Sequence, residues 1–382
     1  MDKLDIVLEL CNSTLLKREK VEVPPLSAKE LEELLYFAGK QGVLPMVMQQ
    51  FAEAKMPDSE THIKIVDWSL KVELWKERFI QRVKRMRYMA KIFADEGIDV
   101  MFFKGATLSL LYPVPHWRMF SDIDFYLYGK SECGIKAMRQ HKIENEEYYH
   151  HHTKASLKGV LLENHYDFFD RRNHKCNIIL DDTLKMLAEK EGRSIKATFL
   201  DKDIKNAYVM TPTMNAIFLM RHMSAHFVSE NIILRMLYDW ILFLKRYAKE
   251  VDWTLVMGQY EASGMMEFVG IVQGLLVSHF SSEFPECPVK PLLGKNTDKV
   301  WKSIANPSAH NPHKKKNLAF CFYEAKVFVN NRWKHRIVYP GESYTLLFIK
   351  YTIRDLTVYF KSLFPASHTS SPAKQITNSK KH

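Results

Sequence analysis

Long hydrophobic runs are missing from this chain of 382 residues. Its most apolar segments, residues 232–244 and 268–280, fall short of the roughly 20 apolar residues that a membrane-spanning helix requires. The first residues carry Asp2, Asp5 and Glu9 among their apolar positions, so they do not resemble a secretory signal peptide. We therefore expect a protein with no membrane-spanning segment and no membrane partner.

Cysteine is also scarce, and its spacing suggests no pairing. The chain has five cysteines, an odd number, without a C-x-x-C motif or the spacing of a disulfide framework. They are Cys11, Cys133, Cys176, Cys287 and Cys321. A reducing compartment fits this pattern best, so we expect a cytoplasmic protein.

The composition that is present indicates a packed globular protein. Hydrophobic residues make up 46% of the chain and aromatic residues 12%, and the length suffices for roughly two or three domains. Lysine plus arginine number 55 against 44 for aspartate plus glutamate, a net charge of +11. This excess indicates either a generally basic surface or an anionic partner, such as a nucleotide or a nucleic acid. No RNA-binding motif supports a nucleic-acid partner.

The most informative stretch is residues 102–127, which predicts two strands joined by a turn, a short helix and a proline-bounded loop. The second strand begins at Ser121 and contains Asp122 and Asp124. Side chains two apart on a strand share one face, with their Cα atoms roughly 6.6 Å apart. Two carboxylates at this spacing can hold a divalent cation, although such pairs also occur on solvated strand edges.

The turn at Lys104 and Gly105 supplies a complement to these acids. Glycine lets the backbone approach a ligand closely. The free N–H groups at the start of the following helix favour an anion such as a phosphate, and Lys104 adds a positive charge. Acidic metal ligands beside an anion-binding turn form the arrangement that phosphoryl and nucleotidyl transfer require.

The same stretch carries the pattern K-G-A-x-x-x-x-L-Y-P-x-P-x-x-R-x-x-S-D-I-D. Its fixed positions are Lys104, Gly105, Ala106, Leu111, Tyr112, Pro113, Pro115, Arg118, Ser121, Asp122, Ile123 and Asp124. This pattern resembles the signature of an uncharacterised family of bacterial nucleotidyltransferases in the polymerase-β-like superfamily. The resemblance implies an enzyme that binds ATP or another NTP, with Mg²⁺ or Mn²⁺ held by the two aspartates.

One departure from the wider superfamily lies at the phosphate turn. Many members carry Gly-Ser there, whereas this chain has Gly105-Ala106. Phosphate would then be bound through backbone N–H groups, helped by Thr107 or Lys104. The resemblance further implies that Arg118 and Ser121 position the loop or a phosphate, or that Arg118 braces Asp122.

A second resemblance supplies a third acid. The family pattern G-V-x-x-E-x-H is present as Gly159, Val160, Glu163 and His165, on the second arm of a hairpin that we predict over residues 148–169. Glu163 would complete the metal site or act as a base on the acceptor hydroxyl, and His165 would contact the nucleotide. Without the resemblance, an exposed strand glutamate would be the simpler interpretation.

Five histidines raise the question of zinc: His150, His151, His152, His165 and His174. Consecutive side chains on a strand point to opposite faces, and structural zinc sites favour spaced ligands. We therefore expect no zinc site, although one of the three adjacent histidines could face the cleft and touch a phosphate.

Two pairs four residues apart lie in helical sequence that also looks like the family. His222 and His226 could bind a metal, but no glutamate follows the first histidine, so the metalloprotease motif H-E-x-x-H is excluded. We expect a buried, hydrogen-bonded pair instead. Arg235 and Asp239 are expected to pair with each other, with Arg235 reaching the nucleotide phosphates as the alternative.

The predicted architecture is α+β, with a small mixed sheet between helical regions. We expect an N-terminal helical region over residues 1–95, with helices at 27–40 and 59–95, and a nucleotidyltransferase domain over 96–182. A C-terminal helical region would cover residues 183–364, and a disordered basic tail residues 365–382.

The expected function is metal-dependent transfer of a nucleoside monophosphate from an NTP to an unidentified acceptor hydroxyl, with release of pyrophosphate. Replacing Asp124 with Asn should abolish activity without unfolding the domain. The alternatives are a catalytically silent nucleotide-binding or regulatory protein on the same fold, and a nucleic-acid-directed transferase. The sequence identifies neither the acceptor, nor the base, nor the oligomeric state.

Overall fold

The computed structural model describes residues 2–16, 23, 25–51, 58–143, 145–148, 150–172, 174–306 and 318–363. These residues form helices around one mixed sheet, so the predicted α+β class is confirmed. The chain divides into two compact units, residues 1–308 with 334–341, and residues 309–333 with 342–382. The predicted disordered tail, residues 365–382, lies outside the described residues.

Helices alternate with the strands of the sheet in the first half of the chain, and helices predominate after it. The helices are α1 (Lys3–Leu16), α2 (Ala28–Lys40), α3 (Leu44–Phe51), α4 (Ser59–Asp95), α5 (Gly105–Ser109), α6 (Ser131–Gln140), α7 (Lys175–Glu191), α8 (Pro212–Ser229), α9 (Leu234–Tyr247), α10 (Trp253–Ala262), α11 (Met266–Phe280), α12 (Lys295–Ile304), α13 (Leu318–Asn330), α14 (Arg332–Val338) and α15 (Tyr344–Leu363), with short 3₁₀ turns η1 (Pro115–Trp117) and η2 (Ala248–Glu250). The strands are β1 (Val100–Phe103), β2 (Asp122–Tyr126), β3 (Asn145–Tyr148), β4 (His152–Leu157), β5 (Val160–His165) and β6 (Ala207–Val209). Among the described residues, no helix is both long and apolar enough to cross a bilayer.

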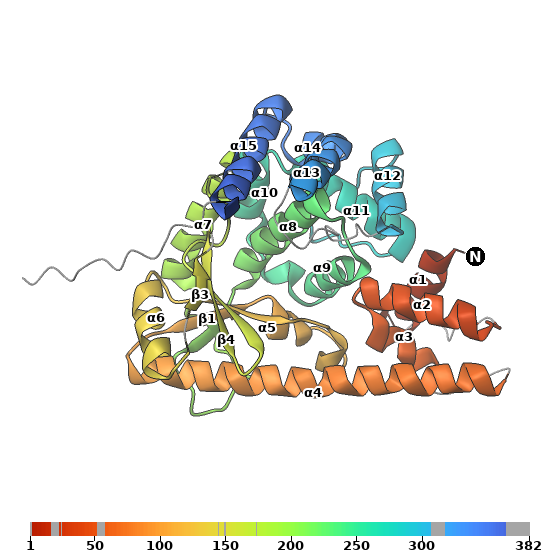
Figure 1. The fold of residues 1–382 in the computed structure, drawn as a ribbon, viewed down its shortest axis with the longest axis horizontal. Helices are drawn as coiled ribbons and strands as arrows, with labels where there is room; N and C mark the ends of the chain where they lie inside the picture. The colour runs from red at the N-terminus through yellow and green to blue at the C-terminus, as the bar shows by residue number, and fades with distance from the viewer. Residues whose placement is uncertain are drawn as a thin grey trace, which may run out of the picture. The chain divides into compact units, whose positions relative to one another are not determined.

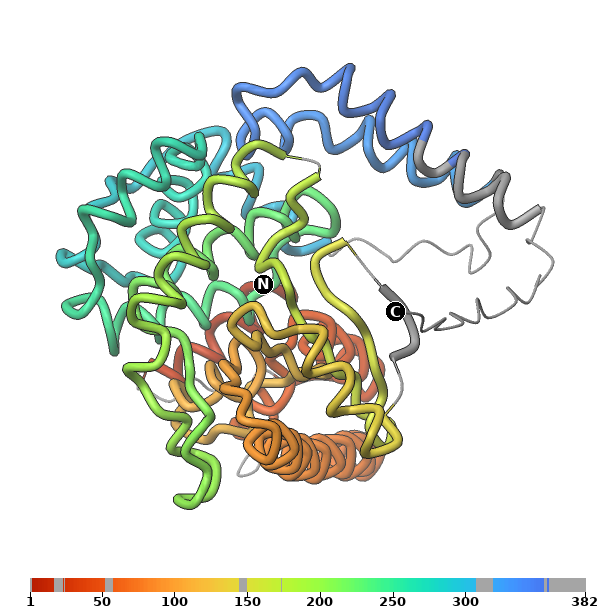
Figure 2. The backbone as a smooth tube through the Cα atoms, turned by 90° about the vertical axis from the view of Figure 1, so that its left-hand side faces the viewer, coloured from red at the N-terminus to blue at the C-terminus, as the bar shows by residue number. Residues whose placement is uncertain are grey.

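The two helices that the sequence predicts before the sheet begin at capped ends. Ser27 and Glu30 form both hydrogen bonds of a capping box at the start of α2. At the start of α4, Asp58 accepts the backbone N–H of Thr61 at 2.7 Å. The buried residues of α4 recur mostly every three or four positions, so one stripe of this helix faces the protein. In Figure 1, α4 passes along the sheet and continues to α2 and α3, and Figure 2 shows it nearly end-on.

The six strands form one sheet in the order β3-β4-β5-β2-β1-β6. Strand β2 pairs antiparallel with β1 and parallel with β5. The predicted hairpin is present as β4 and β5, joined at Lys158 and Gly159. Strand β6 pairs parallel with β1, although the sequence predicts a helical region there. That expectation is wrong at residues 207–209, because a three-residue strand leaves no periodic signal in the sequence.

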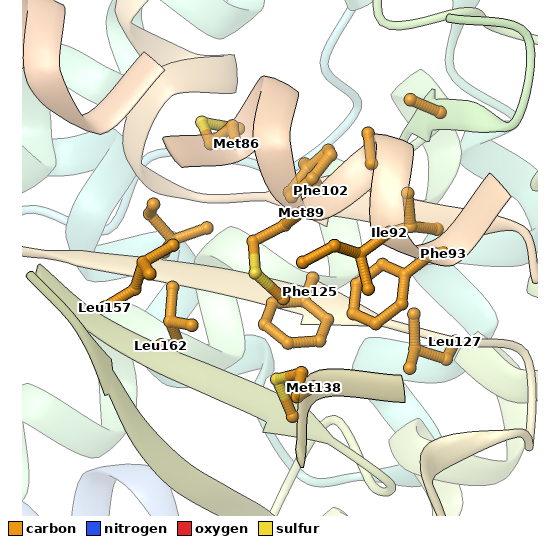
Figure 3. Close-up of a cluster of buried hydrophobic side chains, with 14 of the residues drawn as sticks. Met86, Met89, Ile92, Phe93, Phe102, Phe125, Leu127, Met138, Leu157 and Leu162 are labelled. Carbon is orange, nitrogen blue, oxygen red and sulfur yellow. The ribbon is translucent and has the colours of Figure 1, made fainter. Parts of the chain in front are cut away.

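One face of the sheet packs against α4 and α6. The cluster of buried apolar side chains includes Met86, Met89, Ile92 and Phe93 from α4, Met138 from α6, and Phe102, Phe125, Leu127, Leu157 and Leu162 from the strands and their ends (Figure 3). Each large apolar side chain that is fully buried contributes about 1.5–3 kcal/mol to folding. This face therefore fixes the backbone that carries the polar residues on the opposite side.

The opposite face of the sheet carries the acids. Because side chains alternate along a strand, burying Ile123 and Phe125 on the core side turns Asp122 and Asp124 to the other side. There Phe103 of β1 meets Phe218 of α8, with ring centroids 5.2 Å apart. Helix α8 thus lies over the polar face of the sheet.

The second unit has its own helix pair. Helices α13 and α15 pack through Phe328, whose ring contacts Tyr344, Phe348 and Tyr351. The described residues between 253 and 363 are mostly helical, as the sequence predicts.

Candidate active site

Three carboxylates meet on the polar face of the sheet. Strand β2 places Asp122 and Asp124, and β5 runs parallel beside it with Glu163 directly opposite Asp124. One ligand atom from each of Asp124, Glu163 and His165 lies within 4.8 Å of the other two. Asp122 stays outside this compact group. Burial and the nearby Asp124 charge nevertheless raise the pKa of Asp122, so the two aspartates lie close enough to repel each other.

Asp124 is the most enclosed of the three acids, with 1% of its surface exposed. Its Oδ1 accepts from Lys104 Nζ at 2.7 Å and lies 2.9 Å from His165 Nε2. Burial alone would raise the pKa of Asp124, but the Lys104 ammonium and the His165 hydrogen bond outweigh burial and lower it. The second oxygen, Oδ2, is buried and has no hydrogen-bond partner among the described residues.

His165 faces the acids with one nitrogen and the backbone with the other. Its Nδ1 lies 3.3 Å from the carbonyl of Asp167, while Nε2 lies 2.9 Å from Asp124 and 3.7 Å from Glu163. If Nδ1 donates to the carbonyl, a cation must lie between Nε2 and the carboxylates, either a proton or a metal ion. Burial lowers the pKa of His165, but its contacts with Asp124 and Glu163 raise it overall.

The donor set fits a divalent cation on two independent grounds. A buried carboxylate oxygen of Asp124 lacks a partner, and a carboxylate of Glu163 and an imidazole of His165 point at the same place. Oxygen ligands suit Mg²⁺ or Mn²⁺, and one nitrogen ligand is compatible with Mn²⁺. Asp124, Glu163 and His165 could hold such an ion, with Asp122 beside them.

The adjacent histidines do not behave as expected. Strand β4 begins at His152, so His151 precedes the strand, and its carbonyl accepts the backbone N–H groups of Tyr166 and Asp167. The rings of His151 and His152 are 4.3 Å apart, and they lie 5.5 and 5.0 Å from the ring of His165. The prediction that consecutive histidines diverge is therefore wrong here, because one of them lies outside the strand.

The pKa values of His151 and His152 are both lowered to about 3. Burial is the largest cause, and the nearby His165 is the second. Both imidazoles are therefore neutral at pH 7. The remaining two histidines lie elsewhere: His150 is exposed, and His174 stacks on Tyr339 at 3.7 Å.

The Lys104-Gly105 turn follows β1 directly. Lys104 adopts φ 55°, a conformation that costs a non-glycine residue roughly 1–3 kcal/mol and is common at functional sites. A Cβ on Gly105 would lie 2.9 Å from Phe120 Cδ2, so only glycine fits. Helix α5, which follows, has only five residues, and its dipole therefore contributes less than the sequence suggests. Most of the positive charge at this turn comes from the Lys104 side chain.

Two predicted phosphate-binding residues face away from the acids. The side chain of Ala106 is buried in the hydrophobic cluster, so the missing serine hydroxyl would not have pointed into the site. The Thr107 hydroxyl donates to the Lys104 carbonyl at 2.8 Å, and its side chain lines a separate cavity with Tyr247. The structure thus does not bring Ala106 or Thr107 to the acids by their side chains.

A cavity of about 230 Å³ opens beside the acids, between the turn and two helices. Its polar lining residues are Lys104, Arg118, Ser121, Asp122, His222, His226, Arg235 and Asp239. The rings of His222 and His226 touch edge-to-face at 4.6 Å, and neither side chain is fully buried. The expectation of a buried, hydrogen-bonded pair is therefore wrong. Burial, followed by the charge that His226 would carry, lowers the pKa of His222 well below its usual value.

Arg118 links the turn to helix α9 by hydrogen bonds. Its Nε and Nη2 donate to the two oxygens of Asp239 at 2.7 and 2.8 Å, and its Nη1 donates to the Gly105 carbonyl at 3.0 Å. Tyr112 donates to the same carboxylate at 2.8 Å. Among the described residues, the hydrogen bonds of Arg118 thus go to Asp239 and Gly105 and not to Asp122, and the predicted partner of Asp239, Arg235, is more distant at 3.6 Å.

Two contacts of the site have no local signal in the sequence. The sequence analysis names Asp239, but the pairing of Asp239 with Arg118 spans 121 positions. Arg82 of α4 donates from Nε to the Ser121 carbonyl at 3.2 Å, just before the first aspartate. Ser121 itself is exposed at the mouth of the cavity.

A family of known proteins matches the part of the chain that carries the site. A family model described as "Uncharacterised nucleotidyltransferase" matches residues 27–281, more than half of the chain. The matched region contains the turn, the three acids, the histidines and both helices over the cavity. No curated protein and no solved structure matches the chain.

Proposed function

The chain belongs to this family of uncharacterised nucleotidyltransferases, and from that premise we propose that it transfers a nucleoside monophosphate from an NTP to an acceptor hydroxyl, releasing pyrophosphate. The single observation that carries the proposal is the meeting of Asp124, Glu163 and Asp122 on one sheet face beside a basic cavity. Such a site suits polymerase-β-like chemistry, in which acids hold metal ions and basic groups hold phosphates.

Asp122, Asp124 and Glu163 would hold Mg²⁺ or Mn²⁺, with His165 next to them. The ion, when bound, polarises the α-phosphate and neutralises the charge that develops on its oxygens. Lys104 pairs with Asp124 at 2.7 Å. A cation held by Asp124 would leave Lys104 available to a phosphate.

The cavity fits the phosphates better than the whole nucleotide. Its volume of about 230 Å³ is below the roughly 300–1,000 Å³ of sites that enclose a small ligand. Lys104 and Arg235 contribute two positive charges to its lining, and His222 and His226 offer neutral or charged N–H donors. The nucleoside would then lie outside the cavity, and no residue described here determines which base is preferred.

Glu163 would also act as the base on the acceptor hydroxyl. It lies opposite Asp124 on the neighbouring strand, with Lys154 at 3.8 Å and His152 at 3.5 Å from Oε1. These groups keep Glu163 beside Asp124. The acceptor, whether a sugar, a metabolite, a protein side chain or an RNA end, would bind next to Glu163.

The proposal is tested by incubating purified protein with each α-labelled NTP, with Mg²⁺, Mn²⁺ or EDTA, alone and with cell extract. We expect label on an acceptor, lost in EDTA and in the Asp122→Asn variant. Asp99→Asn is the matched control, because Asp99 precedes β1 and pairs with Arg193 away from the acids. Metal-dependent NTP binding without transfer by the wild type would favour the catalytically silent alternative. Transfer that survives in Asp122→Asn would contradict the proposed site.

A further inference from the structure

Three imidazoles converge beside the acidic centre. One nitrogen from each of His151, His152 and His165 lies within 4.8 Å of the other two. Their rings contact one another in every pairing, at centroid distances between 4.3 and 5.5 Å. His152 and His165 are buried, with 6% and 1% of their surface exposed, and His151 is half-buried.

His165 and His152 contact the acids, at 2.9 Å from Asp124 and 3.5 Å from Glu163, but those contacts do not account for His151. Neutral imidazoles gain little from one another, and burying a polar nitrogen without a hydrogen bond is costly. The Nδ1 of His151 is buried and has no hydrogen-bond partner among the residues that the structure describes. A site that gathers three imidazoles and leaves such a nitrogen unpartnered is suited to a metal ion, because metal ions accept the lone pairs of imidazole nitrogens.

The spacing suits one ion. Nitrogen ligands on a tetrahedral ion with bonds of about 2.0–2.1 Å lie roughly 3.3 Å apart. The ligand nitrogens now lie within 4.8 Å of one another. Rotation of the His151 side chain would reduce this spacing, because the hydrogen bonds from Tyr166 and Asp167 engage the backbone carbonyl of His151 and not its ring. The carbonyl of Asp167 near His165 Nδ1 supplies the outer hydrogen bond that orients a metal-binding imidazole.

We propose that His151, His152 and His165 form a binding site for a divalent transition metal of the kind that prefers imidazole, such as Zn²⁺ or Co²⁺. Imidazole suits these ions, whereas carboxylates and water suit Mg²⁺. Three protein ligands leave a fourth position open, as in catalytic zinc sites, and Glu163 lies 3.5 Å from His152 at that side. With Nδ1 turned to the Asp167 carbonyl, His165 has one lone pair at Nε2, so it would ligate this ion and would then not ligate an ion held by the acids.

The test uses the full-length protein, stripped of metal with a chelator and titrated with Co²⁺. Visible absorption of Co²⁺ reports nitrogen ligands and geometry directly, without any need for activity. We expect one Co²⁺ per chain, not displaced by millimolar Mg²⁺, and displaced by Zn²⁺. The double variant His151→Ala/His152→Ala should bind Co²⁺ at least about tenfold more weakly, since loss of an outer partner alone costs about 10–100-fold.

His150→Ala is the matched control, because His150 is exposed and lies outside the cluster. The affinity of this variant for Co²⁺ should equal that of the wild type.

If circular dichroism shows that the double variant does not fold, the single variant His151→Asn replaces it, because His151 is only half-buried. Unchanged affinity in the folded variant, or ready displacement by Mg²⁺, would overturn the site. The Asp122→Asn variant should keep Co²⁺ binding. Failure of nucleotidyl transfer with intact Co²⁺ binding would reject the proposed function and leave the histidine site standing.

Discussion

Lys104 and Asp124 form the central ion pair of the site. The ammonium lies 2.7 Å from the carboxylate, and burial is the main opposing influence on the pKa of each. Their mutual attraction nevertheless raises the pKa of Lys104 and lowers that of Asp124. A buried charge must be paired to be tolerated. Lys104 therefore compensates the charge of Asp124, and a metal ion held by Asp124 would compete with it.

This balance gives the two aspartates opposite effects on stability. Asp122→Asn should leave the melting temperature of metal-free protein unchanged or raise it, because the substitution removes repulsion with Asp124. Asp124→Asn should lower it by several degrees, because it leaves the Lys104 charge without its partner, at a cost of about 3–5 kcal/mol for a buried pair. The sequence alone suggested that Asp124 could be replaced without loss of stability, and its burial argues otherwise.

The measurement is thermal unfolding followed by circular dichroism, in EDTA, for wild type and both variants. Asp99→Asn serves as the control again, because its partner Arg193 is exposed. Equal destabilisation by Asp122→Asn and Asp124→Asn would contradict a specific Lys104–Asp124 pairing.

At the scale of elements, the sequence predicts what is periodic and locally capped. Helix α4 begins and ends as predicted, since a capping aspartate precedes it and most of its buried residues recur every three or four positions. The β4–β5 hairpin and the acidic strand β2 also follow from local signals. The three-residue strand β6 does not, because it depends on pairing with β1, which is distant in sequence. The residue at which β4 begins does not either, because local signals fix the turn of the hairpin and not where its pairing with β5 ends.

The candidate site was predictable to the same extent. The positions of Asp122, Asp124 and Glu163 follow from alternation along two strands. That His151 turns toward His165 depends on the residue at which β4 begins, which alternation cannot fix. That Ala106 faces the core depends on how α5 packs on the sheet.

A side chain at the glycine of the turn between β1 and α5 would force its neighbours to shift. Gly105→Ala would place a Cβ 2.9 Å from Phe120 and 3.4 Å from the Asp122 carbonyl. We expect a shift of the turn that costs about 1–3 kcal/mol and lowers NTP binding, measured by thermal unfolding and by equilibrium binding. Gly39→Ala is the control, because nothing lies within 4 Å of its Cβ and alanine should stabilise helix α2 by about 0.5–1 kcal/mol. Unchanged stability and binding in Gly105→Ala would show that the close approach does not matter.

At the scale of the whole first unit, the site is assembled from segments that are distant in sequence. Arg118 lies in the loop before β2, and Asp239 lies on helix α9. The two hydrogen bonds between these side chains, of 2.7 and 2.8 Å, join the sheet to the helices over the cavity. Both side chains are buried, at 4% exposure each. Because Arg118 also holds the Gly105 carbonyl, the position of α9 should be coupled to the shape of the turn.

A double-mutant cycle on Arg118 and Asp239 tests this coupling. Each single variant, Arg118→Ala or Asp239→Ala, should cost about 3–5 kcal/mol, because it leaves a buried charge unpaired. The double variant should cost clearly less than the sum of the two, since neither charge then remains. Urea unfolding of all four proteins gives these free energies.

The exposed pair Arg246 and Glu250 provides the comparison. It is also a single ion pair, at 3.3 Å within one helical turn, but both side chains are more than half exposed. Its coupling energy should be only about 0.3–0.5 kcal/mol. If the Arg118–Asp239 cycle were equally small, the pair would not tie the sheet to α9. If it is large, NTP binding should weaken in Asp239→Ala, although Asp239 would touch no phosphate, because the turn loses the arginine that holds its carbonyl.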